Sequence, residues 1–174
     1  DKNMLDKCNE IKKKYNLTLI HPFDDNDVIF GQGTIGLEIF DHIKTIDYVI
    51  IGVGGGGLIS GVASVLKNLN PKIKIFGVEP INSNVITRSL ISGNPEVLSL
   101  NTTIADGLAA PFAGKITLSY IKKYVDEIVC VSEDEIKNSI KSIVYHEKII
   151  PEPAAATTIA ALKYNKINIP KASN

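Results

Sequence analysis

The residues best placed to do chemistry are four consecutive glycines at 54–57, within the stretch DYVIIGVGGGGLISGVASVL at 47–66. An apolar, β-branched run precedes them and an apolar run with helical spacing follows, which predicts a strand ending at Val53 and a helix beginning near Leu58. Glycine loses more backbone entropy on folding than any other residue, so four in a row are costly in a simple turn. The run therefore indicates that some group approaches this backbone closely.

The chemistry that such a loop supports is anion binding. Backbone N–H groups at a helix N-terminus point to the same place as the positive end of the helix dipole, and phosphate is the anion usually bound there. A Cβ atom in the loop would keep phosphate oxygens away from the amides, which favours a phosphate site over a plain turn between strand and helix. The residues that form this candidate site are Gly54, Gly55, Gly56 and Gly57.

The kind of phosphate is left open by the local pattern. The motif G-x-G-x-x-G, typical of dinucleotide sites, occurs at Gly52, Gly54 and Gly57 and again at Gly31, Gly33 and Gly36. Glu79 ends the next predicted strand, near the position of a ribose-binding acid. Two matches in one short chain show how loose the motif is, and an uninterrupted glycine run suits a compact terminal phosphate better than a pyrophosphate.

Other catalytic signatures are missing from the sequence. The histidines His21, His42 and His146 are dispersed without an H-E-x-x-H motif, no G-K-[ST] follows the glycines, and there is no G-x-S-x-G elbow. By themselves the residues indicate an α/β domain with a phosphate-binding loop.

The elements that must position this loop alternate along the chain. Apolar, β-rich runs lie at residues 17–22, 47–53, 72–80 and 126–132. Segments with helical spacing lie at residues 1–15, 33–43, 57–69, 85–93, 115–125, 132–149 and 152–165. Ser132 with Glu135 forms a capping-box pattern at one helix start. We expect a single domain over residues 1–174, a doubly wound parallel sheet of about four strands with helices on both faces.

Composition excludes several partners. The 19 Lys and Arg balance 19 Asp and Glu, which indicates neither nucleic acid nor a membrane surface. Residues 48–66 are uncharged, but their glycines argue against a membrane-spanning helix. Cys8 and Cys130 lack ligand spacing, and we expect free thiols in a reducing, cytoplasmic compartment. The chain opens without Met in an apparent amphipathic helix, which predicts a piece of a longer protein.

Seven segments in order resemble one known group of enzymes. They are HPFDD, GQGTIGLE, GVGGGGLISG, GVEP, TIADGLA, VSEDEI and PEPAAA. In order and spacing they resemble the threonine dehydratase and serine racemase group of fold-type II pyridoxal-phosphate enzymes, from about residue 15 to about residue 165. GGGGL together with TIADG separates the chain from the cysteine synthases, whose loop reads more like GTGGT.

The resemblance implies particular roles. The 5′-phosphate of pyridoxal phosphate would be held through the backbone amides of Gly54, Gly55, Gly56, Gly57 and Leu58. Gly107 would line the cofactor ring and the substrate side, and Glu152 would lie near the pyridine ring. A turn glycine and a helix-start acid beside Pro153 are the simpler interpretations of those two residues.

The family pattern is incomplete in this chain. The family's lysine that forms a Schiff base with the cofactor, in an S-x-K-x-R context, and the S-x-N-H loop are both absent, and the SGGN-type serine would follow residue 174. We therefore expect a fragment of the large cofactor domain that is inactive alone and contains no catalytic residue. Ala155 replaces a usual glycine, and Val85 replaces the second acid of the racemase cation site. Glu79 is then either a weak cation ligand or an exposed acid at a strand end.

The activity that the resemblance implies is deamination of L-threonine or L-serine to a 2-oxo acid and ammonia, with a place in isoleucine biosynthesis and a homo-oligomeric parent enzyme. Serine racemization and hydroxyaspartate dehydration are the alternatives within the group. A non-catalytic nucleotide-binding or regulatory module is the alternative from another class, based on the G-x-G-x-x-G motif. A purely structural domain would leave the glycine run unexplained.

Overall fold

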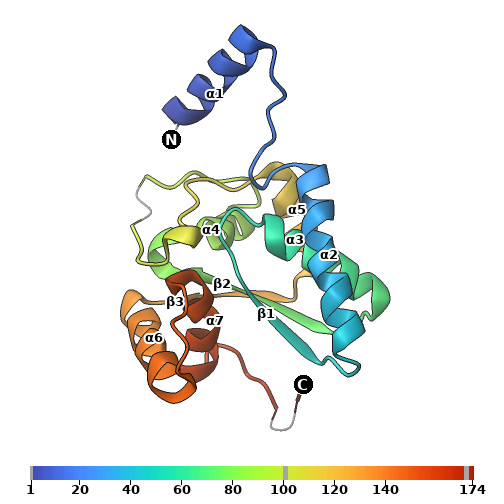
Figure 1. Ribbon diagram of the computed structural model, residues 1–174, viewed down its shortest axis with the longest axis vertical. Helices are drawn as coiled ribbons and strands as arrows, with labels where there is room; N and C mark the ends of the chain where they lie inside the picture. Colours follow the sequence, from blue (N-terminus) through green and yellow to red (C-terminus); the bar gives the residue numbers. More distant parts are fainter. Residues whose placement is uncertain (1, 100–101, 171–172) are drawn as a thin grey trace.

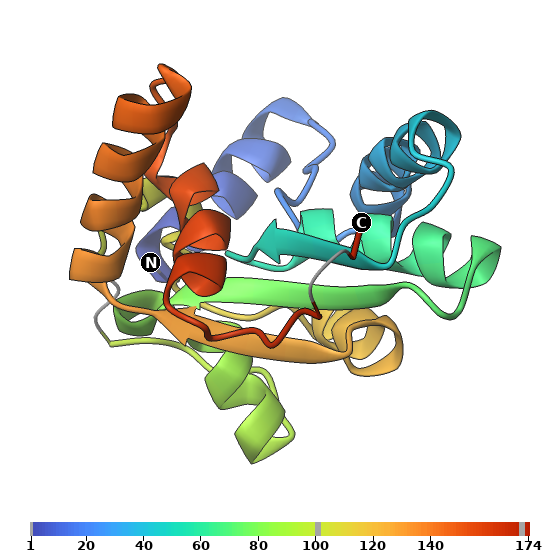
Figure 2. The same cartoon turned by 90° about the horizontal axis from the view of Figure 1, so that it is seen from below.

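The computed structural model describes residues 2–99, 102–170 and 173–174. Within these residues, three parallel strands form one sheet in the order β1 (Tyr48–Gly52), β2 (Lys74–Pro80) and β3 (Glu127–Val131). The strands lie side by side with β2 in the middle (Figure 2). Each coincides with a run predicted to be a strand.

Helices follow and connect the strands. In the described part of the chain they are α1 (Lys2–Tyr15), α2 (Asn26–His42), α3 (Gly57–Leu69), α4 (Val85–Ser92), α5 (Lys115–Tyr124), α6 (Glu133–Glu147) and α7 (Pro153–Lys163). Two short 3₁₀ turns, η1 (Ile81–Ser83) and η2 (Asp106–Leu108), complete the set. All seven predicted helical segments are helices. The capping box is also confirmed, since the Ser132 side chain accepts from the Glu135 amide and the Glu135 carboxylate accepts from the Ser132 amide.

Two groups of buried apolar side chains lie on opposite faces of the sheet. Successive residues of β2 alternate, so Ile75 packs with α3, α4 and α5, whereas Phe76 packs with α6 and α7. Figure 1 shows α6 and α7 on one side of the strands and α2 and α3 on the other. The expected helices on both faces are therefore confirmed.

The predicted strand at 17–22 is wrong, and the sheet has three strands rather than four among the described residues. This segment has no regular secondary structure and pairs with no described strand, and Leu17 and Ile20 are 53% and 70% exposed. A strand exists only through the hydrogen bonds it makes to another strand, so an apolar β-rich run is not sufficient to form one.

Close contact between α2 and α3 accounts for the second G-x-G-x-x-G motif. A Cβ atom on Gly33 would lie 3.0 Å from Val65 Cγ2, and one on Gly36 would lie 3.1 Å from the Val62 carbonyl oxygen. Gly31 lies in the same helix with open space around it. These glycines sit inside a helix and not at a strand end, and Gly33 and Gly36 serve helix packing.

No helix in the described ranges combines the length and the apolar character needed to cross a membrane. The stretch 48–66 is instead divided between β1 and α3 by the glycine turn, as predicted.

Candidate functional site

The glycine run joins the carboxyl end of β1 to the start of α3. β1 ends at Gly52 and α3 begins at Gly57, with Gly56 as its N-cap in a left-handed conformation, φ +89°. In a parallel sheet this edge is where ligands bind. The structure thus places the predicted loop, residues 54–57, at the expected edge.

The amides of this loop have the properties of an anion site. Among the described residues, no hydrogen bond is donated by the amide N–H groups of Gly54, Gly55 or Gly56. The first turn of α3 contains no acidic side chain, and its N-cap supplies no side-chain oxygen. Because the first amides of a helix have no partner within the helix, a bound anion would satisfy them.

The sequence analysis explained these glycines by a bound anion alone. Packing within the protein also excludes side chains at these positions. A Cβ on Gly55 would overlap the ring of Phe23, and one on Gly57 would come within 3.1 Å of Phe23 Cα. A Cβ on Gly54 would lie 3.2 Å from Leu108 Cα. The loop is therefore closely packed from several sides, while its amides have no hydrogen-bond partner in the described ranges.

A cavity of about 660 Å³ opens at this loop. Its lining includes five of the predicted cofactor residues in the loop and Gly107 in η2. Those five are Gly54, Gly55, Gly56, Gly57 and Leu58. Glu152 does not line the cavity, but its Oε1 would lie 3.1 Å from a Cβ on Gly107. The structure thus brings all seven predicted residues to one region, with Glu152 behind Gly107.

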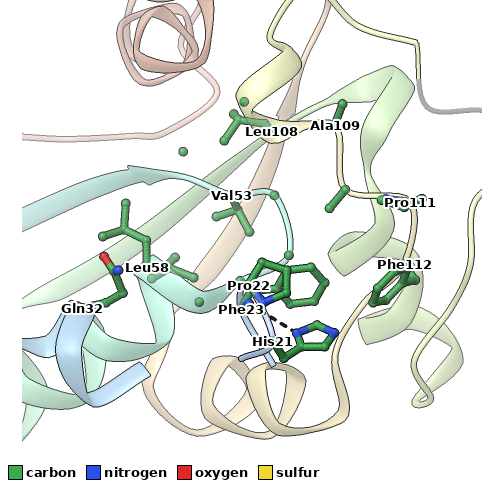
Figure 3. A pocket seen from close by; sticks show the side chains of 18 of the residues that line it. His21, Pro22, Phe23, Gln32, Val53, Leu58, Leu108, Ala109, Pro111 and Phe112 are labelled. Carbon is green, nitrogen blue, oxygen red and sulfur yellow. Dashed lines mark hydrogen bonds between the residues drawn. The ribbon is translucent and has the colours of Figure 1, made fainter. Parts of the chain in front are cut away.

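Aromatic side chains that sequence reasoning did not assign to the site form one wall of the cavity (Figure 3). The ring centroid of Phe23 lies 4.7 Å from that of His21 and 5.3 Å from that of Phe112. His21 Nδ1 accepts from the Asp24 amide at 2.8 Å. His21 and Phe23 belong to the HPFDD segment, which contributed to the family resemblance. Their residue types match no catalytic motif, so the sequence did not assign them to the site.

Glu79 is neither an exposed acid nor a residue of the cavity wall. Its side chain is 0% exposed, and its two oxygens accept from the amides of Ile86 and Thr87, each at 2.8 Å, and from Thr87 Oγ1 at 2.6 Å. The expectation of exposure is wrong because α4 begins directly over the end of β2 and its N-terminal amides bind this carboxylate. Glu79 does not line the cavity at the glycine loop, so it does not have the position expected of a ribose-binding acid.

Burial raises the pKa of the Glu79 carboxyl from 4.5 to about 7, although hydrogen bonds from Thr87 and Ile86 oppose the rise. The unfolded chain therefore releases this proton at lower pH than the folded one. The contribution of Glu79 to stability is intact below pH 4.5, falls as pH rises, and is lost above pH 7.

We expect the unfolding free energy of the wild type to fall by about 3 kcal/mol relative to Glu79→Gln between pH 4.5 and pH 7.5. The glutamine variant cannot ionise, so subtracting its values removes the pH dependence of every other group. Urea unfolding of both proteins across this range measures the difference. A difference that stays constant with pH would mean that Glu79 ionises at its ordinary pKa.

Comparison with known proteins agrees with this site. A sequence profile of the family described as "Pyridoxal-phosphate dependent enzyme" matches residues 2–174. The L-threonine ammonia-lyase of Thermotoga maritima is 40% identical over 171 residues, which are 96% of this chain and 42% of that protein. The catabolic L-threonine dehydratase TdcB of Staphylococcus aureus is 42% identical over 159 residues, 91% of this chain and 46% of that one. The chain thus spans less than half the length of these relatives.

Solved structures show the same similarity. Threonine deaminase isoform 2 from Solanum lycopersicum has a TM-score of 0.85 and 41% identity, covering 91% of this chain and 48% of that one. Serine racemase from Dictyostelium discoideum has a TM-score of 0.83 and 41% identity, covering 92% and 51%. Because the family profile matches residues 2–174, this chain belongs to the family of pyridoxal-phosphate dependent enzymes.

Proposed function

We propose that this chain is part of the large cofactor-binding domain of a lyase that deaminates L-threonine or L-serine to a 2-oxo acid and ammonia. The observation that carries the proposal is the glycine loop, which lines a cavity at the sheet edge and in which the amides of Gly54, Gly55 and Gly56 donate no hydrogen bond within the described part of the chain. The relatives named as threonine ammonia-lyases and dehydratases support the choice of substrate. We place the enzyme in the cytoplasm, as a homo-oligomer, with a role in isoleucine biosynthesis.

The residues of this chain would bind and orient the cofactor. The loop amides and the N-terminus of α3 fit a phosphate dianion, because they offer several N–H donors and no competing acid. Loop residues 54–58 would hold the phosphate, while Gly107 would leave space beside the ring. Glu152, next to Gly107, would lie on the ring side. When bound, pyridoxal phosphate supplies the electron sink that stabilises negative charge at the substrate α-carbon.

A second candidate is racemization of serine, which the similarity to the Dictyostelium serine racemase favours. The two reactions begin from the same substrate class and differ in product. Purified full-length enzyme should bind pyridoxal phosphate and release 2-oxobutyrate from L-threonine or pyruvate from L-serine. Predominant formation of D-serine would select the racemase, and binding of a dinucleotide without turnover would contradict both.

Residues 1–174 alone are expected to show no deamination of threonine or serine. The reason is chemical: no lysine of this chain lies in the sequence context of the family's cofactor lysine. Borohydride treatment in the presence of pyridoxal phosphate, followed by peptide mapping, checks this. Stoichiometric labelling of one lysine together with turnover would contradict the assignment.

A further inference from the structure

A short segment, residues 21–24, packs against the glycine loop through Phe23 and against the start of α5 through Asp24; we refer to it as the strap. Its first residue, His21, accepts through Nδ1 from the amide of the last, Asp24. This bond curls the strap into a compact turn. Its other contacts connect elements that are far apart in the sequence.

Asp24 caps a helix to which it does not belong. Its Oδ1 accepts from the amides of Ile116 and Thr117 at 2.8 and 3.0 Å, and its Oδ2 accepts from the amide of Lys115 at 3.1 Å. The N-cap residue of α5, Gly114, has no side chain to do this, and a Cβ there would overlap the Asp24 carboxylate. Asp24 therefore anchors the strap to the start of α5.

The start of α5 in turn contacts the glycine loop. A Cβ on Gly56 would lie 2.9 Å from Ile121 Cδ1 and 3.2 Å from Thr117 Cβ. Ser60, in the first turns of α3, donates from Oγ to the Thr117 carbonyl at 3.3 Å. The helix that Asp24 caps thus supports the loop from one side.

The strap supports the loop from a second side through Phe23. Its ring and backbone lie against Gly55 and Gly57, and the ring is flanked by His21 and Phe112. Figure 3 shows Phe23 beside the turn that runs from Val53 to Leu58. Since Asp24 is the next residue, its bonds to α5 also fix where the Phe23 ring lies.

We propose that Asp24 is a positioning residue for the cofactor phosphate, because it holds the strap and α5 together around the glycine loop and so keeps the loop amides arranged for binding. This inference rests on the proposed function. Asp24 itself is absent from the cavity lining, so it acts through Phe23 and Thr117. Without it, the loop would have to be ordered at the moment of binding, which lowers affinity.

Asp25 supplies a matched control. It is also an N-cap aspartate, accepting from the amides of Asp27 and Val28 at 2.8 and 3.4 Å, but the helix it caps, α2, is its own. Removing either side chain deletes one helix cap. Only Asp24 joins the strap to α5.

The test compares Asp24→Ala, Asp25→Ala and Asp24→Asn in the full-length enzyme. Pyridoxal phosphate affinity is measured by fluorescence titration, the bound phosphate by its ³¹P resonance, and stability by thermal unfolding of the cofactor-free protein. We expect Asp24→Ala to weaken cofactor binding about tenfold and Asp25→Ala by less than about twofold, with comparable falls in unfolding temperature. Asparagine is a good N-cap and keeps an acceptor oxygen, so Asp24→Asn should restore most of the affinity.

Equal effects of Asp24→Ala and Asp25→Ala on cofactor affinity would overturn the inference, since a general loss of stability would then explain both. Unchanged affinity and an unchanged ³¹P resonance in Asp24→Ala would overturn it as well. A wild-type enzyme that binds no pyridoxal phosphate would instead reject the proposed function.

Discussion

Gly56→Asp is expected to abolish cofactor binding in the full-length enzyme, with the visible absorbance of bound pyridoxal phosphate falling to background. Gly56 has φ +89°, a conformation that costs an L-residue roughly 1–2 kcal/mol. Its Cβ would lie 2.9 Å from Ile121 Cδ1, so the end of the Ile121 side chain or the loop must also shift. The new carboxylate would then place negative charge where a phosphate dianion has to bind.

Gly93→Asp is the control that separates backbone strain and added charge in general from charge placed in the glycine loop. Gly93 also has a positive φ, +80°, but it follows α4, outside the cavity lining, and a Cβ there would meet nothing within 4 Å. The same substitution there introduces similar backbone strain and the same charge without touching the loop. Normal cofactor occupancy in Gly93→Asp and none in Gly56→Asp would support the loop assignment. Normal occupancy in both variants would refute it.

Gly61→Ala is expected to lower the unfolding free energy by about 3 kcal/mol or more, the upper range for overpacking a tight contact. Gly61 is where α3 touches α2: its Cβ would overlap the Ile29 carbonyl oxygen and lie 2.6 Å from the Gly33 nitrogen. Backbone atoms cannot rotate away as side chains do. The two helices would therefore have to separate along their whole contact.

Gly31→Ala is the control for that substitution. Gly31 lies in α2 with nothing within 4 Å of its Cβ position, so alanine there should stabilise the protein by about 0.5–1 kcal/mol through helix propensity. Urea unfolding of both variants measures the two changes. Changes of the same sign and size would show that the contact between α2 and α3 is looser than the structure has it.

Features encoded by neighbouring residues could be predicted from the sequence. The capping box at Ser132 needs only a serine and a glutamate three residues apart, and the structure contains it. The glycine run between β1 and α3 was located for the same reason, because a strand pattern, a turn and a helix pattern follow one another directly. The family resemblance rests on such local segments and is confirmed.

Features that depend on a distant partner could not be predicted in this way. The segment 17–22 has the composition of a strand, yet without a neighbouring strand it stays unpaired. Glu79 has the character of a surface acid, and its burial follows from where α4 begins. The same motif, G-x-G-x-x-G, describes a loop at Gly52 and a helix contact at Gly33.

The sequence by itself determined the order of the helices and of the three paired strands, the position of the glycine loop and the family, because each follows from the types and spacing of residues close together in the chain. Only the tertiary structure decided what surrounds the loop. Asp24 reaches the start of α5 across more than 90 residues, and Phe23 reaches Gly55 from a different segment. Such contacts form only when the packed helices and the sheet bring the segments together, and no local pattern of residue types records which side chain will meet which backbone.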